Sequence, residues 1–102
     1  MTPYASDPTK ESLNLDKHHV EFRYAYRAIQ DPDKIKIYDQ DHSGYNKYGI
    51  WESRWKVIGK AGKRILFVSY CERNGEIRII SSRRVSKAMR RKYKAIKEGN
   101  EL

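Results

Sequence analysis

The residues best suited to chemistry in this sequence are cations, gathered from Ile77 to Lys97 in the segment IRIISSRRVSKAMRRKYKAIK. This segment contains nine Lys or Arg residues and no Asp or Glu. A guanidinium group forms a planar, two-pronged hydrogen bond to phosphate oxygens, and it can stabilise charge that develops at phosphorus when a bond is cut. The segment therefore predicts a surface for a polyanion, of which nucleic acid is the commonest.

Arg78 is the arginine whose direction the sequence indicates most clearly. In IRIIS it alternates with Ile77 and Ile79, so it should project onto the face of a sheet that the helices leave open. There it could hold a phosphate, or it could pair with Glu52 or Glu72 across the sheet. Four more arginines could converge on the same surface, although the sequence does not fix the face that each one takes: Arg54, Arg64, Arg73 and Arg83.

Aromatic residues interleave with these cations. Exposed rings beside arginines stack on unpaired bases, whereas buried rings belong to the core. Trp55 and Tyr70 lie within expected strands, so we predict them to be core residues. Trp51 lies at the edge of a strand, where both interpretations stay open.

Histidines and carboxylates suggest a metal hypothesis that their spacing does not favour. The pairs in question are His18-His19 and the group Asp39, Asp41 and His42. Zinc sites bring three or four ligands at characteristic spacings, and the sequence shows none of these patterns, nor a glycine-rich phosphate loop. We therefore predict no metal and no cofactor, and a histidine could instead act as a general acid or base near neutral pH.

Length and composition predict one cytoplasmic domain over residues 1–102. No apolar run reaches the roughly 20 residues of a membrane span, and the first residues do not resemble a signal peptide. Cys71 lies in an apolar run, which indicates a packed thiol in a reducing compartment. The formal charge of +9 is one-sided, because residues 1–50 hold seven basic against eight acidic residues and residues 51–102 hold fifteen against five. A basic face kept for solubility is the alternative to polyanion binding.

These side chains must be positioned by an α+β fold. The pattern predicts two N-terminal helices, a four-stranded antiparallel meander and a C-terminal helix, with the helices packed on one face of the sheet. Asn74-Gly75 should form a tight hairpin, and Gly99 should stop the last helix. Residues 1–6 and 99–102 are expected to be loose. The predicted helices begin at the N-cap Asp7, at Val20 and at the N-cap Ser86, and the predicted strands are 34–39, 53–59, 64–72 and 77–81.

Three ordered segments resemble the BrnT toxin family of bacterial type II toxin–antitoxin systems, from about Asp7 to Tyr93. DPTKESLNLDKHHVEF resembles a family opening of the form D-x-x-K-x-x-x-N-x-x-K-H-G-V-x-F. WESRWKVIG resembles an E-x-R-x-x-x-x-G strand, and RIISSRRVSKAMRRKY resembles R-I-I-S-A-R-x-A-T-x-x-E-R-x-x-Y. The resemblance implies a RelE-like fold and a metal-independent ribonuclease that stops translation by cutting RNA.

The resemblance also implies a protein partner. Family members are neutralised by a BrnA antitoxin with a ribbon-helix-helix domain, in an expected two-to-two complex that reaches operator DNA only through the antitoxin. The basic strand-to-helix junction would hold RNA phosphates in the free toxin and an acidic or apolar segment of the antitoxin in the complex.

Metal-free RNA cleavage needs a base for the 2′-hydroxyl, cations at phosphorus and an acid for the 5′-oxygen. Carried onto matching positions, three arginines would stabilise charge, Glu52 or His18 would be the base, and Tyr93 or a lysine the acid. The catalytic candidates are Glu52, Arg54, Arg78, Arg83, Tyr93 and His18, and the RNA-binding candidates are Lys17, Arg64, Arg73, Ser81, Arg84, Lys87, Arg90 and Arg91.

Two positions depart from the family pattern. His19 replaces a Gly, and Met89 replaces a Glu in the last helix. If that Glu orients an arginine or carries a proton, Met89 would weaken or abolish cleavage, whereas if it only pairs with neighbouring cations, its loss merely adds positive charge. Two rival functions therefore stay open, namely a basic nucleic-acid-binding module without catalysis and a corepressor that acts only with its antitoxin.

Overall fold

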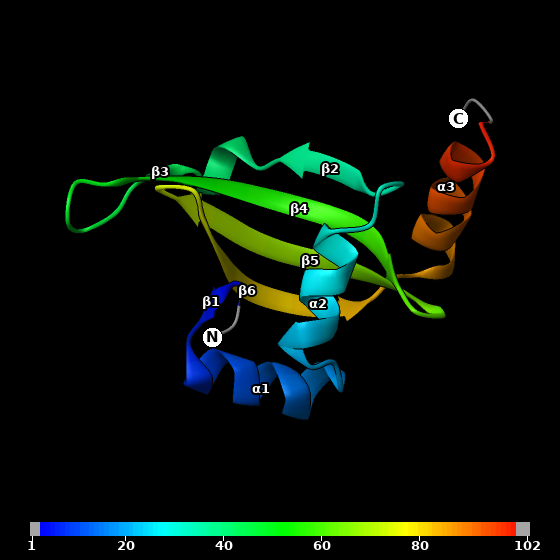
Figure 1. Ribbon diagram of the computed structural model, residues 1–102, viewed down its shortest axis with the longest axis horizontal. Coiled ribbons are helices and arrows are strands. Elements are labelled where there is room, and N and C mark those ends of the chain that lie inside the picture. The colour runs from blue at the N-terminus through cyan, green and yellow to red at the C-terminus, as the bar shows by residue number, and fades with distance from the viewer. Residues whose placement is uncertain (1–2, 100–102) are drawn as a thin grey trace.

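The computed structural model describes residues 3–99 as three helices and a mixed sheet (Figure 1). The strand order is β1-β6-β5-β4-β2, and the short strand β3 pairs with the start of β4. In chain order the elements are β1 (Ala5–Ser6), α1 (Pro8–His18), α2 (Phe22–Ile29), β2 (Ile35–Tyr38), the 3-10 turn η1 (Gln40–His42), β3 (Gly44–Tyr45), β4 (Trp51–Ala61), β5 (Arg64–Arg73), β6 (Glu76–Arg84) and α3 (Lys87–Lys97).

The predicted α+β class and the antiparallel meander β2-β4-β5-β6 are confirmed. The strand count differs, because β1 and β3 bring the sheet to six strands. Residues 1–6 were expected to be loose, yet Ala5 and Ser6 pair in parallel with Arg78 and Ile79 of β6. The expected looseness of residues 1–2 and 100–102 concerns positions outside the described residues. Within residues 3–99, no helix is long and apolar enough to cross a membrane.

Local sequence signals fix the ends of α1. The Asp7 side chain accepts a hydrogen bond from the Thr9 amide at 2.9 Å, and Pro8 follows at the first helical position. Both features satisfy or remove amide donors that the first turn leaves without helical partners. His19 ends the helix in the left-handed conformation with a φ of 57°, which explains why Gly suits this position in the family pattern.

The helix α3 is bounded by the signals that the sequence predicts. The Ser86 hydroxyl accepts a hydrogen bond from the Met89 amide at 3.2 Å, which confirms the predicted N-cap. Gly99 follows the helix with a φ of 78° and its amide bonds to the Ile96 carbonyl. The predicted stop at glycine is therefore confirmed.

The helix α2 packs on one face of the sheet, which we call the helix face. Its apolar side meets Val57, Leu66 and Val68, which point to this face from β4 and β5. Gly59 lies under α2 so closely that a Cβ atom there would collide with the Ala28 carbonyl oxygen. The glycine lets the helix and the strand approach, which no larger residue would permit.

The prediction that all helices share one face is wrong for α3. A second cluster of buried residues, Ile58, Ile65 and Tyr93, lies on the opposite face of the sheet. Val85 and Met89 of the predicted apolar stripe pack against it. The fourth stripe residue, Ile96, is 43% exposed, and the stripe residues that pack on the sheet, Val85, Met89 and Tyr93, all precede it.

Two irregularities shape β6. Asn74 and Gly75 both have positive φ angles, 53° and 79°, so the predicted tight hairpin between β5 and β6 is confirmed. Further along, Ser69 pairs with Ser81 and the next residue of β5 pairs with Ile79, so Ile80 is an extra residue in β6. This β-bulge resets the alternation of side chains along the strand.

Candidate functional site

The face of the sheet opposite α2 carries the candidate site, and we call its uncovered part the open face. Cross-strand partners point to the same side of a sheet, so the register identifies the members. The buried Val57 and Val68 point to α2, and their strand neighbours therefore point away from it. The open face consists of Glu52, Arg54 and Lys56 of β4, Ser69, Cys71 and Arg73 of β5, and Arg78, Ser81 and Arg83 of β6.

The bulge at Ile80 is the reason that Arg78 and Arg83 share a face. In a regular strand, residues an odd number apart point to opposite sides. Arg78 pairs with Cys71, and Arg83 pairs with Phe67, four residues earlier in β5. Both arginines therefore point to the open face, and the sequence pattern without the bulge would separate them.

Carboxylates already contact some of these cations. Glu52 forms an ion pair with Arg73, with Oε2 and a guanidinium nitrogen 3.5 Å apart. The same oxygen accepts a hydrogen bond from the Asn46 side chain at 3.3 Å. Arg78 pairs at 3.6 Å with Glu76 of its own strand, and neither of the predicted partners, Glu52 and Glu72, takes this role in the structure. An incoming phosphate would compete with these long, partly exposed contacts.

Electrostatics around Cys71 show how closely the charges converge. Burial raises the pKa of this thiol, and the charge of Glu52 raises it further, whereas the charges of Arg54, Arg78 and Arg73 lower it. Side chains from three strands thus act on one buried point. The Nε of Arg54 is buried, and no hydrogen-bond partner is found for it among the described residues. The predicted packing of Cys71 is confirmed, since it is a buried free thiol.

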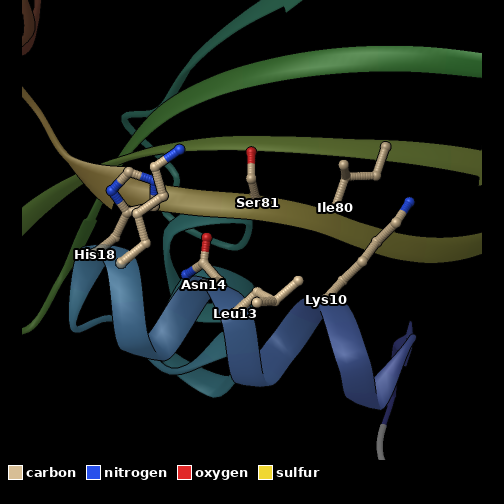
Figure 2. A pocket seen from close by; sticks show the side chains of 7 residues that line it. Lys10, Leu13, Asn14, His18, Ile80 and Ser81 are labelled. Carbon is tan, nitrogen blue, oxygen red and sulfur yellow. The ribbon is translucent and has the colours of Figure 1, made fainter.

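A shallow pocket of about 270 Å³ opens beside the open face, between α1 and β6 (Figure 2). Figure 2 shows Ile80 and Ser81 rising from β6, while Lys10, Leu13 and His18 extend from α1. Lys17 also lines the pocket, so the structure brings together the predicted residues Lys17, His18 and Ser81. The pocket has cations at its rim and apolar side chains along its wall.

Asn14 holds α1 against the sheet and so forms this pocket. Its side-chain oxygen accepts a hydrogen bond from the Ser82 amide at 2.9 Å, and its amide group donates to the Val20 carbonyl at 2.9 Å. Asn14 is buried, and it satisfies the edge of β6 that β1 does not reach. Asn14 was not predicted as a positioning group, although it matches the N of the family opening pattern.

Other predicted residues lie away from the open face. Tyr93 is 2% exposed, and its hydroxyl donates to Asp31 at 2.5 Å beneath α3. Arg64 lies 4.7 Å from the centre of the Tyr24 ring on the helix face. The remaining RNA-binding candidates are exposed near the C-terminal end of the described chain: Arg84, Lys87, Arg90 and Arg91.

The fold of the described residues does not bring the candidate metal ligands together in one group. Asp39 and His42 contact each other, with Oδ2 and Nδ1 2.8 Å apart on an exposed turn. His18 lines the pocket, whereas His19 caps α1 and is exposed. Among residues 3–99, no three His, Cys, Asp or Glu side chains lie together as metal ligands would.

The fold and the site define a small basic α+β protein with an arginine-lined sheet face suited to a polyanion. The chain matches the family of the ribonuclease toxin BrnT of type II toxin–antitoxin systems over residues 7–88, and it belongs to this family. Membership implies an antitoxin partner. No curated protein matches the chain. The family match ends at residue 88, so Met89 and Tyr93 fall outside it.

Proposed function

We propose that this chain is the ribonuclease of a toxin–antitoxin pair and cuts RNA on the open face without a metal ion. The observation that carries the proposal is the convergence of Arg54, Arg73 and Arg78 on an uncovered sheet surface that also carries the carboxylate of Glu52. Family membership supports the ribonuclease activity, and the charge of the face supports an RNA substrate.

In the proposed reaction the 2′-oxygen attacks the adjacent phosphorus. The new P–O2′ bond forms as the P–O5′ bond breaks, which leaves a 2′,3′-cyclic phosphate and a 5′-hydroxyl. Arg54 and Arg78 stabilise the charge that builds on the phosphoryl oxygens, and each such group contributes about 10²–10³-fold to the rate. The leaving 5′-oxygen takes its proton from a lysine or from water.

Register separates the two candidate bases, Glu52 and His18. Ser81, which lines the pocket with His18, pairs through Ser69 of β5 with the level of Lys56 in β4. Ser81 therefore lies two strands away from Glu52 and four residues further along the sheet. Standard strand spacings place these positions roughly 16 Å apart, too far for both groups to act on one phosphate. Glu52 lies beside the arginines, so we assign it as the base.

The pocket then has a different role. Lys17 and His18, with the Ser81 hydroxyl, are suited to hold a neighbouring phosphate of the same RNA strand. Arg83 lies over the Phe67 ring at 4.8 Å, where a stacked guanidinium can still present its edge to an anion. The buried Tyr93 has no part in this proposal.

The partner in this proposal is a ribbon-helix-helix antitoxin of the BrnA type in a two-to-two complex. The resemblance of the chain and the family description support a protein antitoxin. Operator DNA would be contacted by the antitoxin alone.

The test is cleavage of total RNA by the purified chain in EDTA, together with growth after induced expression. We expect cleavage and growth arrest, and a loss of about 10²-fold or more in kcat for Glu52→Gln and Arg78→Ala. Lys63→Ala, a charge removal in the exposed β4–β5 turn, serves as the control. His18→Gln should raise KM and leave kcat nearly unchanged.

Some outcomes would reject the proposal. Intact RNA in the presence of folded protein that still binds the antitoxin would leave the corepressor function. Cleavage that disappears in EDTA would reject the metal-free reaction, and full activity of Glu52→Gln would reject Glu52 as the base.

A further inference from the structure

The helix face has an uncovered half whose chemistry differs from that of the open face. α2 covers the sheet near the turn between β4 and β5, and no described helix lies over the half that carries β3 (Figure 1). We call this half the aromatic face. By register its members are Lys36 and Tyr38 of β2, Tyr45 of β3, Trp51, Ser53 and Trp55 of β4, Glu72 of β5 and Ile77 of β6.

Two pairs of rings form the centre of the aromatic face. Tyr38 and Trp55 meet edge to face with their centroids 5.0 Å apart, and Tyr45 and Trp51 do the same at 5.2 Å. The Trp51 indole donates a hydrogen bond to the Ser53 hydroxyl at 3.0 Å, which fixes the orientation of its ring. Paired and anchored rings lose little side-chain entropy when a partner covers them.

The rings are exposed to an extent that is unusual for large apolar side chains. Tyr38 is 42% exposed, Trp51 is 46% exposed and Tyr45 is 75% exposed. An exposed group of this size marks an interaction surface in a soluble protein. On the aromatic face the sheet also lacks the covering layer that α2 provides over the other half.

Local charge on the aromatic face is balanced. Lys36 forms an ion pair with Glu72 at 3.5 Å, and its ammonium group lies 4.2 Å from the centre of the Trp55 ring. The register places no other charged strand residue of the described chain on this half of the helix face. A phosphate would find only the paired Lys36 here, whereas the open face gathers several cations, among them Arg54, Arg78 and Arg83.

We infer that the antitoxin binds the aromatic face through an apolar segment, at a surface separate from the arginines that act on RNA. Tyr and Trp with few net charges are the composition of the core of a protein interface. The inference rests on the proposed toxin function, because it identifies where the partner of that toxin docks. The chain therefore has one neutral aromatic surface suited to a protein partner and, on the opposite face of the sheet, one cationic surface suited to RNA.

The first measurement is the affinity of the antitoxin of the pair for the purified toxin by calorimetry. Trp51→Ala and Tyr45→Ala should each weaken binding at least about tenfold. Leu15→Ala removes a side chain on α1 that is 43% exposed, close to the value for Trp51, and should change nothing. Arg78→Ala should retain most of the affinity, since it lies on the other face. Thermal unfolding checks that each variant is folded, and Tyr45 is exposed enough to be replaced without loss of core packing.

The second measurement is growth. Cells expressing Trp51→Ala should stop growing even when the antitoxin is co-expressed, whereas cells expressing the parent chain should recover. Wild-type affinity of both ring variants would overturn the inference. So would weaker binding of a 2′-O-methyl oligonucleotide by these variants at unchanged antitoxin affinity, which would assign the rings to RNA, or a concentration-dependent dimer that they abolish. If the parent chain arrests no growth but the ring variants still lose the antitoxin, the toxin function fails and the docking site stands.

Discussion

Tyr93 and Asp31 form the most buried polar contact between α3 and the rest of the chain. Besides the Tyr93 hydroxyl, Asp31 accepts the Lys60 amide at 2.7 Å and the Asp33 amide at 2.9 Å. Burial raises the pKa of Asp31, but these hydrogen bonds and the charge of Lys97 outweigh it and hold the pKa below its usual value. Burial and the neighbouring carboxylate raise the pKa of Tyr93. A tyrosine held in this way serves the fold.

Tyr93→Phe should lower the free energy of unfolding by about 1–3 kcal/mol at neutral pH, because it leaves Asp31 short of a buried partner. A carboxyl with a depressed pKa stabilises the fold above its unfolded pKa of about 3.9 and loses that contribution as the pH falls through its folded pKa. The deficit of the variant should therefore shrink below about pH 4. Urea titrations at several pH values measure it, with Tyr48→Phe, an exposed position, as the control. A deficit independent of pH would contradict the coupling to Asp31.

His19→Gly should raise the free energy of unfolding by about 1 kcal/mol, because His19 ends α1 with a left-handed backbone that costs a residue with a Cβ atom. Asn74 also has a positive φ, but asparagine tolerates this conformation, so Asn74→Gly should gain less. Thermal unfolding of both variants gives the comparison. An equal gain at the two positions would reject the explanation from backbone strain.

At the scale of elements, the close approach of α2 and β4 depends on Gly59. Gly59→Ala should destabilise the protein by about 1–3 kcal/mol or more, because the new methyl group meets a backbone carbonyl of α2 that cannot move alone. Gly44→Ala is the matched control, since a Cβ atom there would meet nothing within 4 Å. Denaturant midpoints measure both effects. Similar midpoints for the two variants would show that α2 can shift.

Local signals predicted the elements well, and long-range packing decided what they missed. Asp7, Ser86 and Gly99 marked helix ends, and the Asn74-Gly75 pair marked the hairpin, because each acts on backbone within a few residues of itself. The apolar stripe of α3 shows which side of the helix is buried. It does not show which face of the sheet that side covers, so this face could not be predicted from the sequence. The two-residue strands β1 and β3 have no periodicity to detect.

The candidate site was predicted in composition but not in arrangement. The sequence indicated that Arg54 could converge with Arg78 but did not fix its face, and the register places the two arginines on either side of Cys71. Arg64 and Tyr93 seemed equally suited from their types, yet Arg64 faces α2, and Tyr93 is buried between α3 and the sheet. Which face a residue takes depends on pairing across strands, and no neighbouring residue in the sequence encodes it.

At the scale of the whole molecule, the charge of the C-terminal half should make RNA affinity depend steeply on salt. Each phosphate contact to a single strand contributes about 0.7 to the slope of log K against log salt. Arg83→Ala should lower that slope by about this amount, and Lys63→Ala should not. Anisotropy titrations with a 2′-O-methyl oligonucleotide at several salt concentrations measure the slopes. Equal slopes for the two variants would mean that RNA senses only net charge and not the open face.

Because β6 contains an extra residue, the arrangement of the open face depends more on the length of this strand than on the residue type at the bulge. Replacing Ile80 leaves Ser81 and Arg83 where they are, whereas deleting it would turn both toward α2 and would carry Ser82 from the core to the open side. Related sequences can therefore carry different residue types at position 80. A three-nucleotide deletion there would place Arg78 and Arg83 on opposite faces in a single mutation. Among related sequences, we expect insertions and deletions to avoid this strand.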